Sequence, residues 1–136
     1  MDKNTTRLAG EFLVAGELSR RGIPVSITIG NAKSIDIIAS TAMGDIKIET
    51  KAGRTKSNWP ISKELVAEDS FYIFVYLKTA NQIEKNMPPE YYIVPGFDLI
   101  ENNLIAGKDG KQSVKYSDLD DVKYRNRWDK LEKDLR

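Results

Sequence analysis

Four residues in the first half of the sequence could together carry out metal-assisted hydrolysis: Glu11, Asp36, Glu49 and Lys51. Glu49 and Lys51 are two residues apart in a segment that alternates like a β-strand, so their side chains should project from one face, about 7 Å apart. If Asp36 lies on the neighbouring strand and faces the same way, two carboxylates and an ammonium group converge. Two close carboxylates repel each other and are best tolerated with a divalent cation between them.

The chemistry of such a group is that of a histidine-free hydrolytic centre. Carboxylate oxygens suit Mg²⁺ or Mn²⁺. A bound cation acidifies a water molecule and stabilises charge on a phosphate, and a neighbouring lysine can orient that water or help to deprotonate it. The sequence contains no cysteine and no histidine, which excludes thiolate nucleophiles, Ser-His-Asp triads and zinc sites built from those residues.

Glu11 belongs to a segment that predicts a helix over residues 6–21, in which apolar side chains recur at helical spacing: Leu8, Phe12, Ala15 and Leu18. The direction of Glu11 falls inside this apolar stripe, where a carboxylate is costly without a partner. Either it bends to solvent or pairs with an arginine, or it faces a site on the neighbouring sheet. On the second interpretation, we expect Asp36, Glu49 and Lys51 to meet on the face of the sheet that the helix covers.

Alternating apolar and polar residues predict three strands, over residues 25–29, 35–39 and 45–51. The nearly all-apolar run 70–77 predicts a central strand buried on both faces, and 91–94 predicts another strand. Helical turns are expected at 61–68, at 97–103 and in a final helix beginning at Ser117. A strand face that carries Lys-Glu-Lys is also common where ion pairs cross between strands, so a purely structural ion-pair network remains an alternative.

The composition is that of an ordinary globular protein. The chain has 136 residues, 40% of them hydrophobic and 30% charged, with a formal net charge of +1, which suits one domain spanning residues 1–136. The near-zero charge argues against a strongly basic protein that coats nucleic acid. No apolar run is long enough for a membrane span, and the first residues do not resemble a signal peptide, so a cytoplasmic location is expected.

Basic residues surround the polar loop that follows Lys51. Arg54, Lys56 and Lys63 could hold phosphate groups near the proposed site, which makes them candidate nucleic-acid-binding residues. The alternative is an ordinary solvated loop.

The segments that contain the four candidate residues resemble the PD-(D/E)XK nuclease superfamily, and more closely its small bacterial members related to the archaeal Holliday-junction resolvases. The matching stretches run from Ala9 to Leu18, Arg21 to Val25, Ser34 to Ile38 and Ile48 to Lys51. The sequence departs from the pattern at Ile35, where the family's name has proline. It also lacks a clear glutamine after Lys51.

This resemblance implies an α/β fold with a restriction-endonuclease-like core, a mixed β-sheet flanked by helices. It implies that Asp36, Glu49 and Glu11 bind Mg²⁺ or Mn²⁺, that Lys51 acts with them in catalysis, and that DNA is the substrate. Many nucleases of this fold are dimers, so a homodimer is expected. Because the superfamily includes inactive members, a nuclease-like domain that only binds nucleic acid or protein is the alternative.

Overall fold

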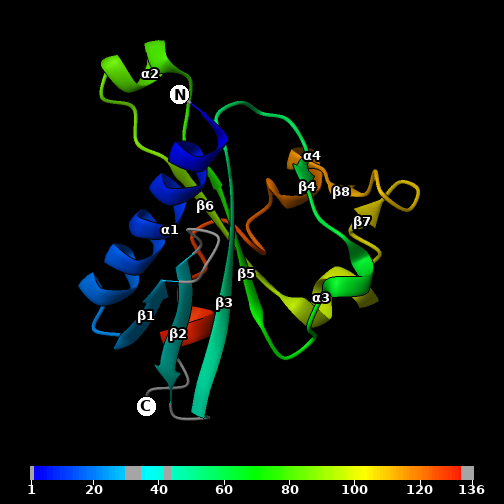
Figure 1. Ribbon diagram of the computed structural model, residues 1–136, viewed down its shortest axis with the longest axis horizontal. Coiled ribbons are helices and arrows are strands. Elements are labelled where there is room, and N and C mark those ends of the chain that lie inside the picture. The colour runs from blue at the N-terminus through cyan, green and yellow to red at the C-terminus, as the bar shows by residue number, and fades with distance from the viewer. Residues whose placement is uncertain (1, 30–34, 42–43, 133–136) are drawn as a thin grey trace.

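A mixed five-stranded sheet forms the centre of the molecule (Figure 1). The computed structural model describes residues 2–29, 35–41 and 44–132, and only the backbone of residues 35 and 36. The sheet has the order β1-β2-β3-β5-β6, and its strands are β1 (Val25–Ile29), β2 (Ile35–Thr41), β3 (Gly44–Gly53), β5 (Phe71–Tyr76) and β6 (Glu90–Pro95). β3 and β5 are parallel, and the other neighbouring pairs are antiparallel. The prediction of an α/β protein with a mixed sheet is confirmed.

Helix α1 (Lys3–Arg20) packs against one face of this sheet. It begins three residues before the predicted start because the Asp2 carboxylate accepts a hydrogen bond from the Thr5 backbone N–H at 2.8 Å, which caps the helix. Its side chains Val14 and Leu18 are fully buried in one cluster with Ile48 and other apolar residues of the sheet. Among the described residues, no helix combines the length and the apolar character needed to cross a membrane.

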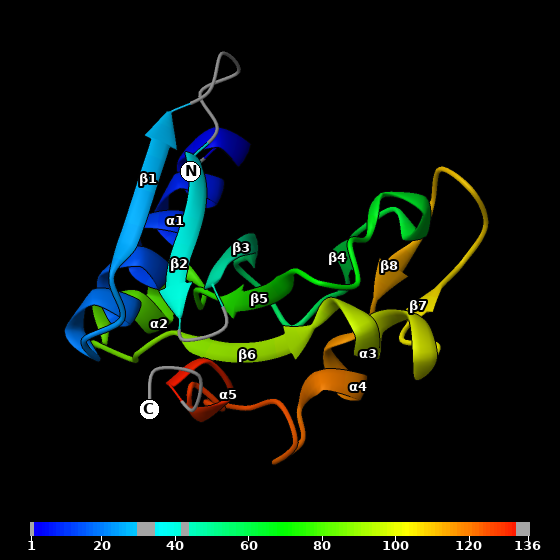
Figure 2. The ribbon, with the colours of Figure 1, turned by 90° about the horizontal axis from the view of Figure 1, so that it is seen from below.

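A second, three-stranded sheet packs over the other face, made of β4 (Trp59–Pro60), β8 (Ser113–Val114) and β7 (Ile105–Ala106). Trp59 joins the two sheets: it is 2% exposed, its indole Nε1–H donates to the Val75 carbonyl at 3.3 Å, and its ring packs on Phe74 with a centroid distance of 5.4 Å. In Figure 2, β1 and β2 lie at one side of the molecule, the small sheet lies at the opposite side, and β5 and β6 lie between them.

The short helices and the end of the chain differ in part from expectation. The predicted helix over 61–68 is wrong, since only one 3-10 turn forms there, η1 (Lys63–Leu65). The helical turns expected at 97–103 form as α3 (Gly96–Glu101). Helix α2 (Ala80–Glu84) was not predicted. The single final helix is also wrong: α4 (Tyr116–Leu119) and α5 (Asp129–Glu132) are separate single turns.

The segment between α4 and α5 forms turns in place of a helix, and it bonds to the outer edge of β6 through one isolated β-bridge, between Arg125 and Tyr92. The Tyr124 carbonyl accepts from the Ile93 N–H at 2.9 Å, and the Asn126 N–H donates to the Tyr91 carbonyl at 3.0 Å. Asn126 has a φ of 53°, a left-handed conformation that a helix cannot contain. The C-terminal segment therefore closes one edge of the central sheet.

A nearly buried carboxylate, Glu90, organises the end of the sheet where β5 stops. It pairs with the Lys78 ammonium and accepts hydrogen bonds from the hydroxyls of Tyr92 at 2.6 Å and Tyr116 at 2.9 Å. Burial alone would raise the pKa of Glu90, but the hydrogen bonds from these three residues outweigh it and lower the pKa to about 2. Glu90 therefore stays ionised well below neutral pH.

The contact between α1 and β3 yields a test of the packing. A Cβ added to Gly10 would lie 2.6 Å from the Ala52 Cβ, whereas one added to Gly16 of the same helix would meet nothing within 4 Å. We expect Gly10→Ala to lower the free energy of unfolding by about 1–2 kcal/mol, because overpacking outweighs the gain in helix propensity. Gly16→Ala, the matched control, should raise it by up to about 1 kcal/mol. Urea unfolding measures both, and a stabilising Gly10→Ala would contradict the close approach of helix and strand.

The Glu90 cluster predicts a pH dependence of stability. The folded-state pKa of Glu90 is about 2, below its ordinary value of 4.5, so the ionised group contributes stability above pH 4.5 that is lost as the pH falls towards 2. At about 1.4 kcal/mol per pKa unit this loss is roughly 3 kcal/mol. Glu90→Gln should destabilise the protein by a similar amount at pH 7, because Lys78 is left buried without its partner. The free energy of unfolding of this variant should then fall less steeply as the pH is lowered.

Urea unfolding at pH 7, 4 and 2.5 measures this effect. Glu84→Gln is the control, since Glu84 is exposed on α2 and its removal should leave the wild-type pH profile intact. An unchanged acid profile in Glu90→Gln would show that other groups control the acid loss.

Candidate functional site

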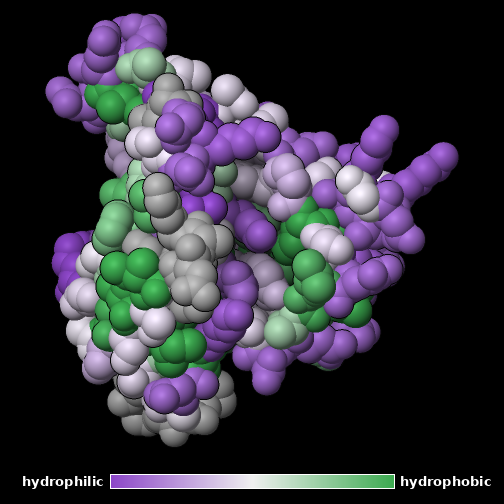
Figure 3. Space-filling model, in the orientation of Figure 1, coloured by the Kyte–Doolittle hydropathy of each residue, from purple (hydrophilic) through white to green (hydrophobic). Residues whose placement is uncertain are grey.

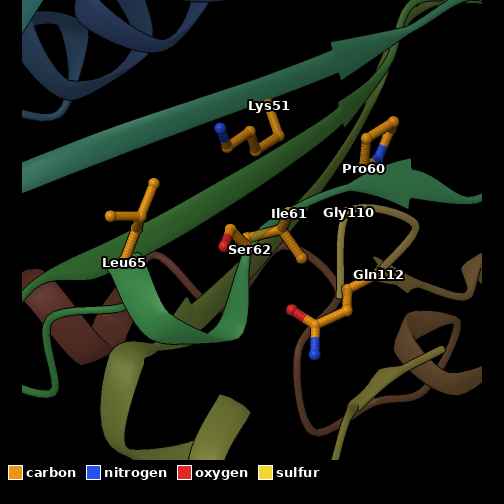
Figure 4. Close-up of a pocket in the computed structure, with 7 residues that line it drawn as sticks. All are labelled: Lys51, Pro60, Ile61, Ser62, Leu65, Gly110 and Gln112. Atoms are coloured by element: carbon orange, nitrogen blue, oxygen red, sulfur yellow. The ribbon is translucent and has the colours of Figure 1, made fainter. Parts of the chain in front are cut away.

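Glu49 and Lys51 of β3 line a groove between the central sheet and η1. One part of the groove, about 160 Å³, is bounded by these two side chains, by Tyr72 and by the turn that contains Ser62 and Leu65. A second part, about 340 Å³, shares Lys51, Ser62 and Leu65 and extends to Gln112. Figure 3 shows a hollow between the β1–β3 side of the molecule and the small-sheet side. Figure 4 shows the Lys51 side chain lying over Ile61 and Ser62.

The groove lies on the face of the sheet opposite to α1, so the expectation that Glu49 and Lys51 meet beneath this helix is wrong. In the parallel β3–β5 ladder, Glu49 is level with Tyr72 and Lys51 with Phe74, both of which belong to the cluster under the small sheet. The physical reason is strand alternation. Because the apolar residues at 46 and 48 are buried with α1, the residues at 49 and 51 must point the other way.

The central sheet opens beside Glu49. The pairing of β2 with β3 extends to Ile37 and Ile48, whereas β3 stays paired with β5 on its other side as far as Gly53 and Tyr76. The backbone of Asp36 is in β2, opposite Thr28 of β1. If the β2–β3 register were continued by one pair beyond Ile37 and Ile48, Asp36 would lie across from Glu49. The Asp36 side chain lies outside the described residues.

Glu11 is buried on the α1 side of the sheet. It is 4% exposed, and the Nε of Arg7, one helical turn earlier, lies 3.3 Å from its Oε1. The preceding residue, Gly10, packs on Thr50 and Ala52 of β3, just past the point where β2 and β3 separate. Its burial in the apolar stripe and its pairing with an arginine agree with the sequence analysis. It is not among the residues that line the groove.

The two charges in the groove have different surroundings. The Glu49 carboxylate forms an ion pair with Lys47 on the same strand face, with 3.0 Å between Nζ and Oε1, and both side chains are partly exposed. Lys51 is half-buried, and no side chain in the described part of the chain forms an ion pair or hydrogen bond with its ammonium. Among the side chains that the structure describes, the Lys51 ammonium is therefore left available to a ligand.

Tyr72 adds a neutral hydroxyl to the groove wall. Burial raises its pKa, a hydrogen bond from the Ala67 N–H at 2.9 Å opposes the rise, and the negative charge of Glu49 adds to it. The hydroxyl consequently remains protonated and can donate a hydrogen bond beside Glu49.

The three candidate nucleic-acid-binding residues do not form one cluster with the same role. Lys63 is exposed at the start of η1, beside the groove, and its backbone N–H donates to the Gln112 Oε1 at 2.9 Å. Arg54 follows the last residue of β3 and is half-exposed. The Lys56 ammonium instead lies 5.5 Å from the centre of the Tyr116 ring, which belongs to α4.

The sequence analysis did not identify Tyr72, Ser62 or Gln112 as groove residues. Tyr72 reads as an ordinary core aromatic, and only the parallel register with β3 reveals that it lies beside Glu49. Gln112 comes from a connection about 60 residues later in the chain, and no local pattern marks it. Ser62 belonged to a segment predicted to be helical.

The donor set allows a hard cation but depends on Asp36. Within residues 2–29, 37–41 and 44–132, no three acidic side chains lie close enough together to hold a metal ion. Of the two candidate ligands whose side chains the structure describes, Glu49 lines the groove and Glu11 does not. A second carboxylate from residue 36, across the opened strand pair, would give the oxygen-only pair that Mg²⁺ or Mn²⁺ prefers.

No protein-family model, no curated protein and no solved structure matches the chain. Its function therefore has to be inferred from its own residues.

The groove charges should matter little for stability. Because the Lys47–Glu49 pair is partly exposed, it should contribute less than about 1 kcal/mol. We expect Glu49→Gln and Lys51→Met each to change the free energy of unfolding by less than about 1 kcal/mol in metal-free buffer. Urea unfolding tests this, with the strongly destabilising Glu90→Gln as the reference. Losses of several kcal/mol from both groove variants would support a structural ion-pair network instead.

Proposed function

We propose that this chain is a metal-dependent nuclease that hydrolyses phosphodiester bonds in DNA, with a restriction-endonuclease-like fold. The observation that carries the proposal is the arrangement of Lys51: its ammonium lies in a groove beside Glu49, without a partner among the described side chains. A lysine that only stabilised the fold would be expected to have an acidic partner or to extend into solvent.

The resemblance adds the metal to this arrangement. Glu49 and Asp36 would bind Mg²⁺ or Mn²⁺ across the opening between β3 and β2, and Glu11, on the α1 side of the sheet, would complete the set through water. When bound, the cation would acidify a water molecule and offset negative charge on a phosphate. Glu11 is well placed for an indirect role, because it lies in the turn of α1 that packs on β3 beside the opening.

The protein's own groups would orient the substrate and water. The Lys51 ammonium can donate to the attacking water or to a phosphate oxygen, which stabilises the charge that develops in the transition state. The protonated Tyr72 hydroxyl can donate from the neighbouring strand. Ser62 and Gln112 offer further polar groups on the opposite wall.

The net charge of the chain is only +1, so attraction of the DNA backbone would have to come from basic residues close to the groove. Lys63 beside the groove and Arg54 at the end of β3 are the candidate phosphate contacts. Lys56 is the weaker candidate, because its ammonium already lies on the Tyr116 ring. A mixed sheet that carries a helix on one face also agrees with the proposed fold.

The proposal is tested by separating metal binding from cleavage. Lys51→Ala should retain Mn²⁺ binding, since an ammonium does not coordinate a cation, but should reduce cleavage about 100-fold or more. Glu49→Gln should lose both metal binding and cleavage. Arg54→Ala should weaken DNA binding and reduce its dependence on salt, without affecting the metal. Calorimetric Mn²⁺ titration and cleavage of supercoiled plasmid, nicked duplex and a four-way junction measure these effects.

Lys85→Ala is the matched control, because Lys85 is an exposed lysine at the end of α2, and it should retain wild-type binding and cleavage. If the wild type binds Mn²⁺ but cuts none of the substrates, the domain is a non-catalytic binding module. If Lys51→Ala cleaves at the wild-type rate, the role assigned to Lys51 is wrong.

A further inference from the structure

The two edge strands of the central sheet differ in whether their outer backbone groups are paired. The outer edge of β6 is closed by the C-terminal segment, which bonds to Ile93 and Tyr91. β1 forms the opposite edge, and in the part of the chain that the structure describes it has one strand neighbour, β2. An open edge presents unpaired backbone groups that can pair with another strand.

The hydrogen-bond pattern identifies the outward-facing groups of β1. The Ser40 N–H donates to the Pro24 carbonyl at 2.9 Å, so residues 24 and 40 form a hydrogen-bonded pair. Such pairs alternate in an antiparallel ladder, which directs the backbone groups of Ser26 and Thr28 towards β2. The N–H and C=O groups of Val25, Ile27 and Ile29 therefore face the open edge.

The side chains at this edge are unusual for an unprotected strand. β1 reads Val-Ser-Ile-Thr-Ile and carries no charged residue and no proline, the features with which edge strands usually block pairing. Ile27 is 46% exposed, Ile29 is 76% exposed, and Phe12 of the adjoining helix α1 is 59% exposed. Figure 3 shows hydrophobic side chains gathered at the surface where Figure 1 places β1.

We propose that β1 pairs in antiparallel fashion with β1 of a second copy of the chain, centred on Ile27. In this register Ile27 lies opposite Ile27 of the second copy and Val25 lies opposite Ile29, so every outward backbone group of these three residues has a partner. Ser26 lies opposite Thr28. The two five-stranded sheets would become one continuous sheet across a two-fold axis.

The sequence of β1 favours a second copy over an unrelated protein as the partner. Its alternation of apolar and hydroxyl residues is the same read in either direction from Ile27, so antiparallel self-pairing brings like side chains together at each position. The strand offers no charge through which a different partner could be selected. This inference does not depend on the proposed nuclease activity.

The absence of cysteine from the sequence makes the register testable by cross-linking. In the proposed dimer the two Ile27 Cα atoms lie about 5.5 Å apart, within reach of a disulfide, whereas the two Ile29 Cα atoms are separated by about 13 Å along the strands. With diamide as the oxidant, Ile27→Cys should form a covalent dimer rapidly and Ile29→Cys should not. Random collision predicts the opposite order, because Ile29 is the more exposed residue.

Light scattering on unlabelled protein provides the second measurement. The wild type should have twice the chain mass of 15.4 kDa, and Ile27→Lys should be monomeric, since it sets two ammonium groups opposite each other. Ile83→Lys, which alters an exposed isoleucine on α2, should remain dimeric, and thermal melts followed by circular dichroism confirm that each variant is folded. A monomeric wild type, or faster cross-linking of Ile29→Cys, would overturn the proposal.

Discussion

The two-sided character of β3 is the constraint on which the site depends. Its residues at 46 and 48 are buried with α1, while Lys47, Glu49 and Lys51 alternate with them on the other side. The packing of Gly10 on Thr50 and Ala52 fixes the helix against the strand at the same level. Burial of the apolar face therefore determines where the charged face points, and any change that tilted α1 would also redirect the groove residues.

The groove itself follows from the parallel pairing of β3 with β5. Parallel neighbours need a connection that crosses the sheet from one end to the other. Here the connection contains β4 and η1 and passes over the face opposite to α1, so Ser62 and Leu65 become the wall that faces Lys51. Trp59 secures this crossover by inserting between the two sheets. The same topology that completes the sheet thus encloses the candidate site.

The sequence predicted the elements with strong internal patterns. The alternating segments at 25–29 and 45–51, the all-apolar run of β5 and the stripe of α1 correspond to real elements, because one residue pattern decides each of them. The face that Glu49 and Lys51 occupy was predicted wrongly, since alternation separates the two sides of a strand without saying which one the helix covers. The turns of residues 120–127 are held by hydrogen bonds to β6, about 30 residues earlier, and no local pattern encodes these bonds.

The closing of β6 by the C-terminal segment also affects how the chain can fold during synthesis. Trp128 and Leu131 are fully buried in the cluster that contains Val14 and Leu18 of α1. The core beneath the first helix is therefore finished by residues that leave the ribosome more than a hundred positions later. Until these residues are synthesised, the core beneath α1 is incomplete and the β6 edge is unpaired, so this part of the fold can close only after synthesis is nearly finished.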